Sequence, residues 1–155
     1  MCRRKVNGRG LVVALMAMFV MAPCLAEPKV PFESVLRKRV GQFYAACIKQ
    51  DWPKLFDMIA PFVRRCDSPE DFRRGWTKDG GAKILSWRLV EITYDANLVG
   101  QEFKVDCSGQ AYRVAAGASV TISQLDQEGE EKPKRGDNYL KWVLIDGVWF
   151  AVGPE

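Results

Sequence analysis

Apolar residues recur every three or four positions between residues 33 and 50, which is the spacing of one buried face of an α-helix. The positions are Val35, Leu36, Val40, Phe43, Tyr44, Cys47 and Ile48. The charged residues Arg37, Lys38 and Lys49 fall off this stripe. The pattern therefore predicts an amphipathic first helix over residues 33–50.

Two shorter helices are expected after it. Asp51-Trp52-Pro53 is typical of a helix start, because proline suits an early helical position, and Pro61 is expected to end this second helix near Ala60. Ser68-Pro69-Glu70-Asp71 predicts the start of a third, since serine caps helices and acidic side chains favour the first turn.

Beyond residue 83 the pattern changes to strands. Residues 84–94 are rich in β-branched and aromatic side chains, and alternation follows in 102–108, 111–115 (after a kink at Gly109), 119–125, 138–145 and 148–152. Asp146-Gly147 between the last two segments is a strong two-residue hairpin signal. The charged stretch 126–137 is expected to be a loop. The order predicts an α+β fold, with three N-terminal helices followed by about four to six antiparallel strands.

The last hairpin is apolar on both faces. Pairing Ile145 with Val148 places Trp142, Leu144 and Trp149 on one face, and Val143, Phe150 and Val152 on the other. An antiparallel sheet with one wet face should alternate apolar with polar residues, so each face needs a cover. Helices can cover one. We expect either a homodimer contact through the sheet or another segment of the chain, the loop 126–137 or the N-terminal lead-in, to cover the other.

The N-terminus has the three parts of a secretory signal. Four basic residues and no acidic residue lie in the first ten positions, an apolar run follows over 11–22, and Cys24-Leu25-Ala26 places small residues before a cut at Glu27. The apolar run is short for a membrane span. We expect residues 1–26 to be a cleaved signal peptide and the protein to be periplasmic or secreted. An uncleaved anchor, or a lipid-modified Cys24, are the alternatives.

The expected mature chain, residues 27–155, is one domain with nearly balanced charge. Four of the 23 basic residues and none of the 19 acidic residues lie in 1–26, which leaves 19 of each. The excess of basic over acidic residues therefore lies in the signal segment and gives no support for a nucleic-acid partner.

Three cysteines remain after the signal. Cys47 lies in the apolar stripe of the first helix and is expected to be a buried thiol. An oxidising compartment permits one disulfide, for which Cys66 and Cys107 are the better pair.

The chain resembles the nuclear transport factor 2-like superfamily, in its exported bacterial branch. The residues that carry the resemblance are Phe43-Tyr44-Ala45-Ala46, Gln50-Asp51-Trp52, Leu55-Phe56-Asp57-Met58-Ile59 and the closing run from Trp142 to Val152. The resemblance covers residues 33–153 and implies a cone, in which a curved antiparallel sheet wraps the helices around a pocket. Members include isomerase-like and dehydratase-like enzymes and many non-catalytic domains, so it does not decide the chemistry.

The chain has no histidine, which excludes Ser-His and Cys-His catalysis and histidine metal sites. No metal or cofactor motif is present. The resemblance implies that Tyr44 could hold an oxyanion and that Asp67, after the second helix, could act as a base, with Asp106 a distant candidate for a second acid. Asp67 lies in a polar turn, so its simpler interpretation is a turn residue. The simpler interpretation of Tyr44 is an aromatic residue of the core.

Aromatic residues could line a pocket or an interface, and the candidates are Trp87, Tyr94, Tyr112, Trp142 and Trp149. We therefore expect an exported, non-catalytic domain that holds a partner protein or a small apolar ligand. An isomerase-like or lyase-like enzyme using Tyr44 and a carboxylate, and a membrane-anchored subunit of an envelope assembly, remain the alternatives.

Overall fold

The computed structural model describes residues 32–64, 66–77, 83–105, 107–128 and 131–152. The expected signal segment, 1–26, lies outside these residues. None of the described helices is both long enough and apolar enough to cross a lipid bilayer.

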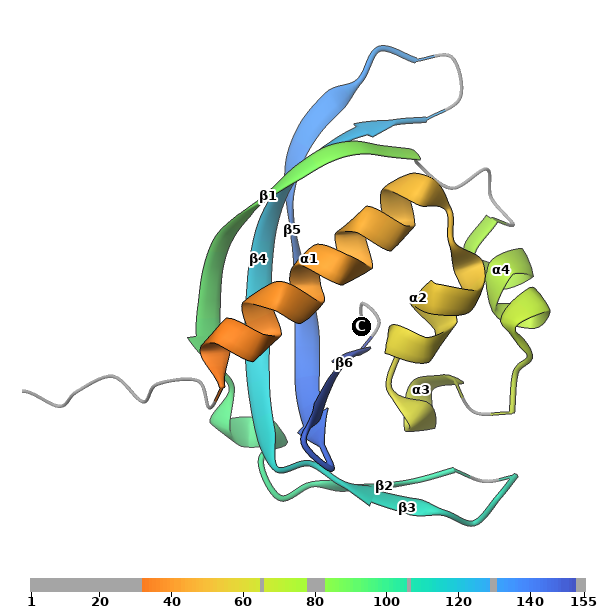
Figure 1. The fold of residues 1–155 in the computed structure, drawn as a ribbon, viewed down its shortest axis with the longest axis vertical. Coiled ribbons are helices and arrows are strands. Elements are labelled where there is room, and N and C mark those ends of the chain that lie inside the picture. The colour runs from red at the N-terminus through yellow and green to blue at the C-terminus, as the bar shows by residue number, and fades with distance from the viewer. Residues whose placement is uncertain (1–31, 65, 78–82, 106, 129–130, 153–155) are drawn as a thin grey trace, which may run out of the picture.

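The first half of the described chain is helical. It contains α1 (Glu33–Lys49), α2 (Trp52–Met58), α3 (Pro61–Arg64) and α4 (Pro69–Thr77) (Figure 1). The predicted stripe of α1 is buried at Leu36, Val40, Phe43 and Tyr44, whereas Val35 and Ile48 at its edges are exposed. Helix α1 therefore presents one apolar face to the sheet.

The described part of the chain has four α-helices where three were expected. The second helix ends at Met58, because Ile59 turns extended and forms a bridge with Ala151 of the sheet. Pro61 then opens α3 instead of ending α2, since proline is tolerated in the first turn of a helix. The expected helix starts are present: the Asp51 carboxylate accepts a hydrogen bond from the Lys54 amide, and the Ser68 hydroxyl accepts one from the Asp71 amide.

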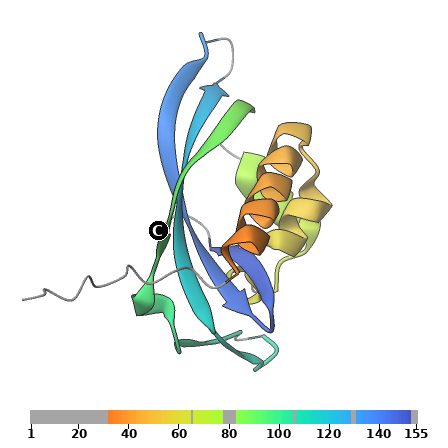
Figure 2. The ribbon, with the colours of Figure 1, turned by 60° about the vertical axis from the view of Figure 1, so that its left-hand side comes forward.

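The second half forms an antiparallel sheet with the strand order β1-β4-β5-β6. Its strands are β1 (Lys83–Tyr94), β4 (Ala116–Gln127), β5 (Lys134–Ile145) and β6 (Val148–Val152). The sheet is curved, does not close on itself, and carries the α-helices on one face (Figure 2). The short strands β2 (Glu102–Lys104) and β3 (Ala111–Arg113) pair separately beyond the 3₁₀-helix η1 (Ala96–Leu98). This confirms the α+β class.

The predicted strand boundaries were wrong in two places. The segment 102–108 is a strand only to Lys104, because the chain turns back at Gly109, which has φ of +66°. The charged stretch 126–137 is not all loop, since β4 and β5 extend into it and pair as far as Asp126 and Lys134. The hairpin at Asp146-Gly147 is confirmed. Ile145 pairs with Val148, and both turn residues have positive φ, as a type I′ turn requires.

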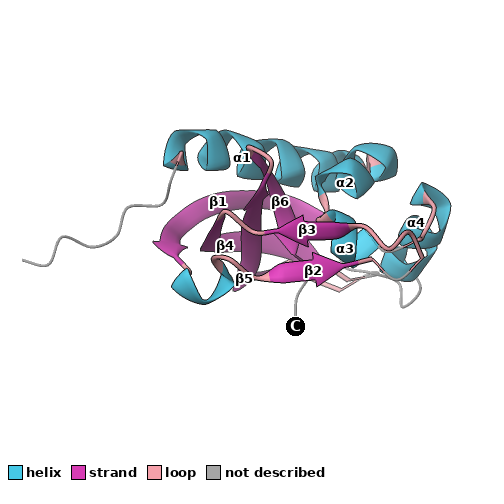
Figure 3. Ribbon diagram, turned by 90° about the horizontal axis from the view of Figure 1, so that it is seen from below, coloured by secondary structure: helices cyan, strands magenta, loops and turns pink. Residues whose placement is uncertain are grey.

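One apolar face of the last hairpin is buried within the chain, and the other is covered in part. Trp142, Leu144 and Trp149 are buried in the main core beneath the helices. Val143 and Ile145 are buried in a second cluster, to which η1 and the β2–β3 hairpin contribute Leu98, Phe103 and Tyr112. The β2–β3 hairpin lies across that end of the sheet (Figure 3). Tyr139 and Val148 of the second face remain 64% and 43% exposed. The expected homodimer stays a prediction.

Candidate functional site

A cavity of about 350 Å³ lies between the C-terminal half of α1 and the sheet. We call it the α1 cavity and define it by its lining residues: Phe43, Tyr44, Cys47, Trp76, Ile84, Gln124, Asn138 and Leu140. They come from α1, α4, β1, β4 and β5, so helices and sheet both shape it. Its volume falls in the range of small-molecule sites, about 300–1,000 Å³.

One wall of the α1 cavity is aromatic and held by ring contacts. Tyr44 stacks on Trp87 with ring centroids 5.0 Å apart, and Phe43 meets Tyr44 edge to face at 5.3 Å. Trp76 of α4 lies 5.2 Å from Phe72 and 6.4 Å from Trp52, measured between ring centroids. Because each ring is supported by others, this wall is preformed.

The polar side chains that line the α1 cavity from the sheet are Gln124 of β4 and Asn138 of β5. The core-facing residues of β4 are Ala116, Ala118, Val120 and Ile122, and the same alternation reaches Gln124 and Asp126 at its end. Gln124 donates a hydrogen bond from Nε2 to Oδ2 of Asp126 at 2.7 Å. Oε1 of Gln124 and Oδ1 of Asp126 are buried without a hydrogen-bond partner among the described residues. Such unpartnered acceptors are uncommon and call for an explanation.

Burial suppresses the acidity of the two titratable groups that line the α1 cavity from α1. It raises the pKa of Tyr44 above its ordinary value, and electrostatic repulsion from Asp126, and at high pH from the Cys47 thiolate, raises it further. Burial also raises the pKa of the Cys47 thiol to about 12. Both groups are therefore protonated at neutral pH, so Cys47 presents an apolar thiol and not a nucleophilic thiolate.

The structure does not bring Tyr44 and Asp67 together. Asp67 is exposed and lines a different cavity of about 270 Å³, together with Arg64, Cys107 and Tyr112. The turn before α4 carries Asp67 to that side of the helices, as its polar surroundings in the sequence suggest. The carboxylate that acts electrostatically on Tyr44 is Asp126. Asp106 lies outside the described residues.

The other expected lining residues have different places. Trp142 and Trp149 are fully buried in the main core, and Tyr94 packs against that core half-buried. Tyr112 belongs to the second cluster, beside the stacked pair Phe62 and Phe103, whose centroids are 4.1 Å apart. None of the five aromatic candidates lines the α1 cavity, but Trp87 and Trp142 contact the lining residues Tyr44 and Phe43.

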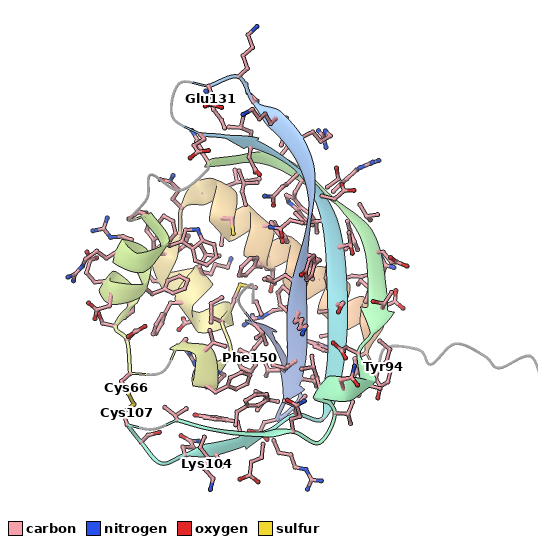
Figure 4. The ribbon with its side chains drawn as sticks, turned by 180° about the vertical axis from the view of Figure 1, so that it is seen from behind. Cys66, Tyr94, Lys104, Cys107, Glu131 and Phe150 are labelled. Carbon is pink, nitrogen blue, oxygen red and sulfur yellow. A yellow bond between two sulfur atoms is a disulfide. The ribbon has the colours of Figure 1, made fainter. Side chains whose placement is uncertain are left out.

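Cys66 and Cys107 form a disulfide, with Cα atoms 6.2 Å apart (Figure 4). The bond joins the segment before α4 to the β2–β3 turn, so it fastens the hairpin that covers the second cluster. Within the described residues, no group of three or more histidine, cysteine or acidic side chains is placed to hold a metal ion.

Sequence reasoning missed Gln124, Asp126 and Asn138. A signal for the first two was present, because continuing the inward alternation of Val120 and Ile122 by two steps reaches two polar side chains. Polar residues at core-facing positions of a strand indicate a site. The assignment of 126–137 to a loop concealed the inward position of Asp126.

No family model matches this chain, and no curated protein matches it. Among solved structures, it is similar to the solution structure of a SEC-C motif containing protein from Rhodopseudomonas palustris. The two share 16% sequence identity with a TM-score of 0.51, over 81% of this chain and 77% of the other. At that identity the similarity is one of fold.

Proposed function

We propose that this chain is a non-catalytic binding domain that holds a small, largely apolar molecule in the α1 cavity. The observation that carries the proposal is the combination of a preformed aromatic wall with the buried, unpartnered Oε1 of Gln124. Apolar sites with few polar groups are the usual form of small-molecule pockets. The raised pKa values of Tyr44 and Cys47 fit a binding role, because neither group then supplies a base or a nucleophile at neutral pH.

The proposal includes the setting expected from the sequence. An exported domain of the nuclear transport factor 2-like kind would meet its ligand in the periplasm or the medium. The disulfide is compatible with an oxidising compartment.

The test is binding of N-phenyl-1-naphthylamine, an apolar fluorescent probe with one N–H donor. We expect saturable binding that Cys47→Phe abolishes, because the larger side chain fills the α1 cavity from α1. Ile48→Phe is the matched control, since the neighbouring Ile48 is exposed and does not line the cavity. Equal binding by both variants would contradict the proposal.

An isomerase-like or lyase-like enzyme is the second candidate, and the electrostatic effect of Asp126 on Tyr44 favours it. Asp126 would replace Asp67 as the base, and Tyr44 would donate to an oxyanion. The test is exchange of α-protons of cyclohexanone with D₂O, followed by NMR. Exchange that Asp126→Asn and Tyr44→Phe both abolish would establish catalysis, and no exchange above buffer would remove this candidate.

A further inference from the structure

We propose that the ligand of the α1 cavity is a small organic cation, namely a primary or secondary ammonium group on an apolar body. This inference rests on the proposed function and names the chemical class of the ligand. It starts from the polar pair at the end of β4.

Asp126 fixes which end of the Gln124 amide is available. A carboxylate only accepts hydrogen bonds, so the bond of 2.7 Å to Oδ2 of Asp126 must use the amide nitrogen of Gln124. The other end, Oε1, is then an acceptor, and it is buried in a residue that lines the α1 cavity. Oε1 of Gln124 therefore calls for a ligand that donates a hydrogen bond, and the unpartnered Oδ1 of Asp126 adds negative charge behind it.

Beside Gln124 lies the carboxylate of Asp126, which does not itself line the α1 cavity. No ion pair among the described residues involves Asp126. Its cross-strand neighbour Lys134 instead lies 2.7 Å from Glu131, with 80% of its side chain exposed. Among the described residues, those that line the α1 cavity include no lysine or arginine. A ligand cation that bonds to Gln124 would thus be attracted by the carboxylate behind it.

The aromatic wall suits the same ligand. The rings of Phe43, Tyr44 and Trp76 line the α1 cavity, and aromatic faces attract cations. A quaternary ammonium would use the rings but could not donate to Gln124. A neutral alcohol would donate but would not respond to the charge of Asp126. An ammonium that keeps at least one N–H uses both features.

The experiment measures binding of four phenyl compounds of similar shape to the purified protein at neutral pH by calorimetry. They are 2-phenylethylamine, its N,N,N-trimethyl derivative, 2-phenylethanol and 3-phenylpropanoate. We expect 2-phenylethylamine to bind at least tenfold tighter than the trimethyl derivative and the alcohol, and 3-phenylpropanoate to bind weakest. If the alcohol or the trimethyl derivative binds as tightly as the amine, or if the carboxylate binds tighter, the inference is overturned.

Variants then locate the effect. Asp126→Asn should weaken amine binding at least tenfold and leave alcohol binding unchanged, whereas the same substitution at the exposed Asp137 should change neither. If Asp126→Asn lowers Tm too far for binding measurements, Gln124→Met removes the acceptor and should weaken binding of both the amine and the alcohol. Equal effects of the Asp126 and Asp137 variants would contradict the inference. If the amine fails to bind while N-phenyl-1-naphthylamine binds in the cavity, only this inference fails. If neither binds, the proposed function fails as well.

Discussion

The ring of Tyr44 in α1 stacks on the indole of Trp87 in β1, with ring centroids 5.0 Å apart and planes inclined by 27°. Tyr44 is buried, and Trp87 packs against the main core from an edge strand of the sheet. The contact ties the first helix to the first strand beside the α1 cavity. Tyr44 therefore has a packing role whether or not its hydroxyl takes part in chemistry.

Substituting Tyr44 separates its ring from its hydroxyl. Tyr44→Phe keeps the stack and should change the free energy of unfolding by less than about 1 kcal/mol, whereas Tyr44→Ala leaves a void and should cost about 3 kcal/mol. Denaturant unfolding of the two variants measures this. A large loss in Tyr44→Phe would show that the hydroxyl itself holds the fold.

Removing the disulfide should destabilise the protein by about 4 kcal/mol in the chain-entropy model, because it closes a loop of 41 residues. The variant combines Cys66→Ser with Cys107→Ser, and guanidinium unfolding measures its stability. Adding dithiothreitol should reproduce the loss in the wild type and have no effect on the variant. An unchanged wild type under reduction would show that packing alone holds the β2–β3 hairpin.

Gly117 is a position that only glycine fits. A Cβ atom there would lie 2.5 Å from Cβ of Leu98 and 2.7 Å from the carbonyl oxygen of Asp95, because η1 approaches β4 closely. Gly117→Ala should therefore cost about 1–3 kcal/mol. Gly136→Ala on β5 is the matched control, since a Cβ there meets nothing within 4 Å. Thermal unfolding measures the Tm of both variants. An equal fall in Tm for the two would refute the close approach of η1 to β4.

Stability should fall at alkaline pH through Cys47. Its pKa is raised from 9.0 to about 12 by burial, so the folded state holds the proton more tightly than the unfolded state. This contribution is complete below about pH 9 and is lost towards pH 12, by about 1.4 kcal/mol per pH unit.

The check compares the wild type with Cys47→Ala at pH 8.0 and pH 10.5. Between these values the wild type should lose about 2 kcal/mol more of its free energy of unfolding than the variant. Parallel losses would mean that Cys47 is exposed to solvent in the folded protein.

The fold class could be predicted because local patterns specify it. The stripe of α1, the caps at Asp51 and Ser68, and the turn at Asp146-Gly147 each depend on residues close together in the sequence. The break between α2 and α3 could not be predicted from local patterns. It depends on the bridge between Ile59 and Ala151, which are 92 residues apart in the sequence. Long-range pairing here overrides a local proline signal.

The candidate site was only partly predictable for a related reason. Tyr44 lies on a periodic helix, so its inward position follows from the sequence. The carboxylate that acts on Tyr44 could not be identified in this way. Asp67 and Asp126 both lie at ends of elements, and only the tertiary fold decides which one is near Tyr44. The cover of the second apolar face was likewise hidden, because the short strands β2 and β3 give a weak pattern.

Strand β4 contributes to the core and to the polar pair in one unbroken alternation, from Ala116 to Asp126. Inserting or deleting a single residue before Val120 would exchange the two sides of the strand downstream, turning Ser123 and Leu125 inward and Gln124 and Asp126 outward. Substitutions at Gln124 or Asp126 should change the polar end of the α1 cavity and leave the packing of Ile122 in place. We therefore expect this end of the cavity to tolerate point substitutions but not a change in the length of β4.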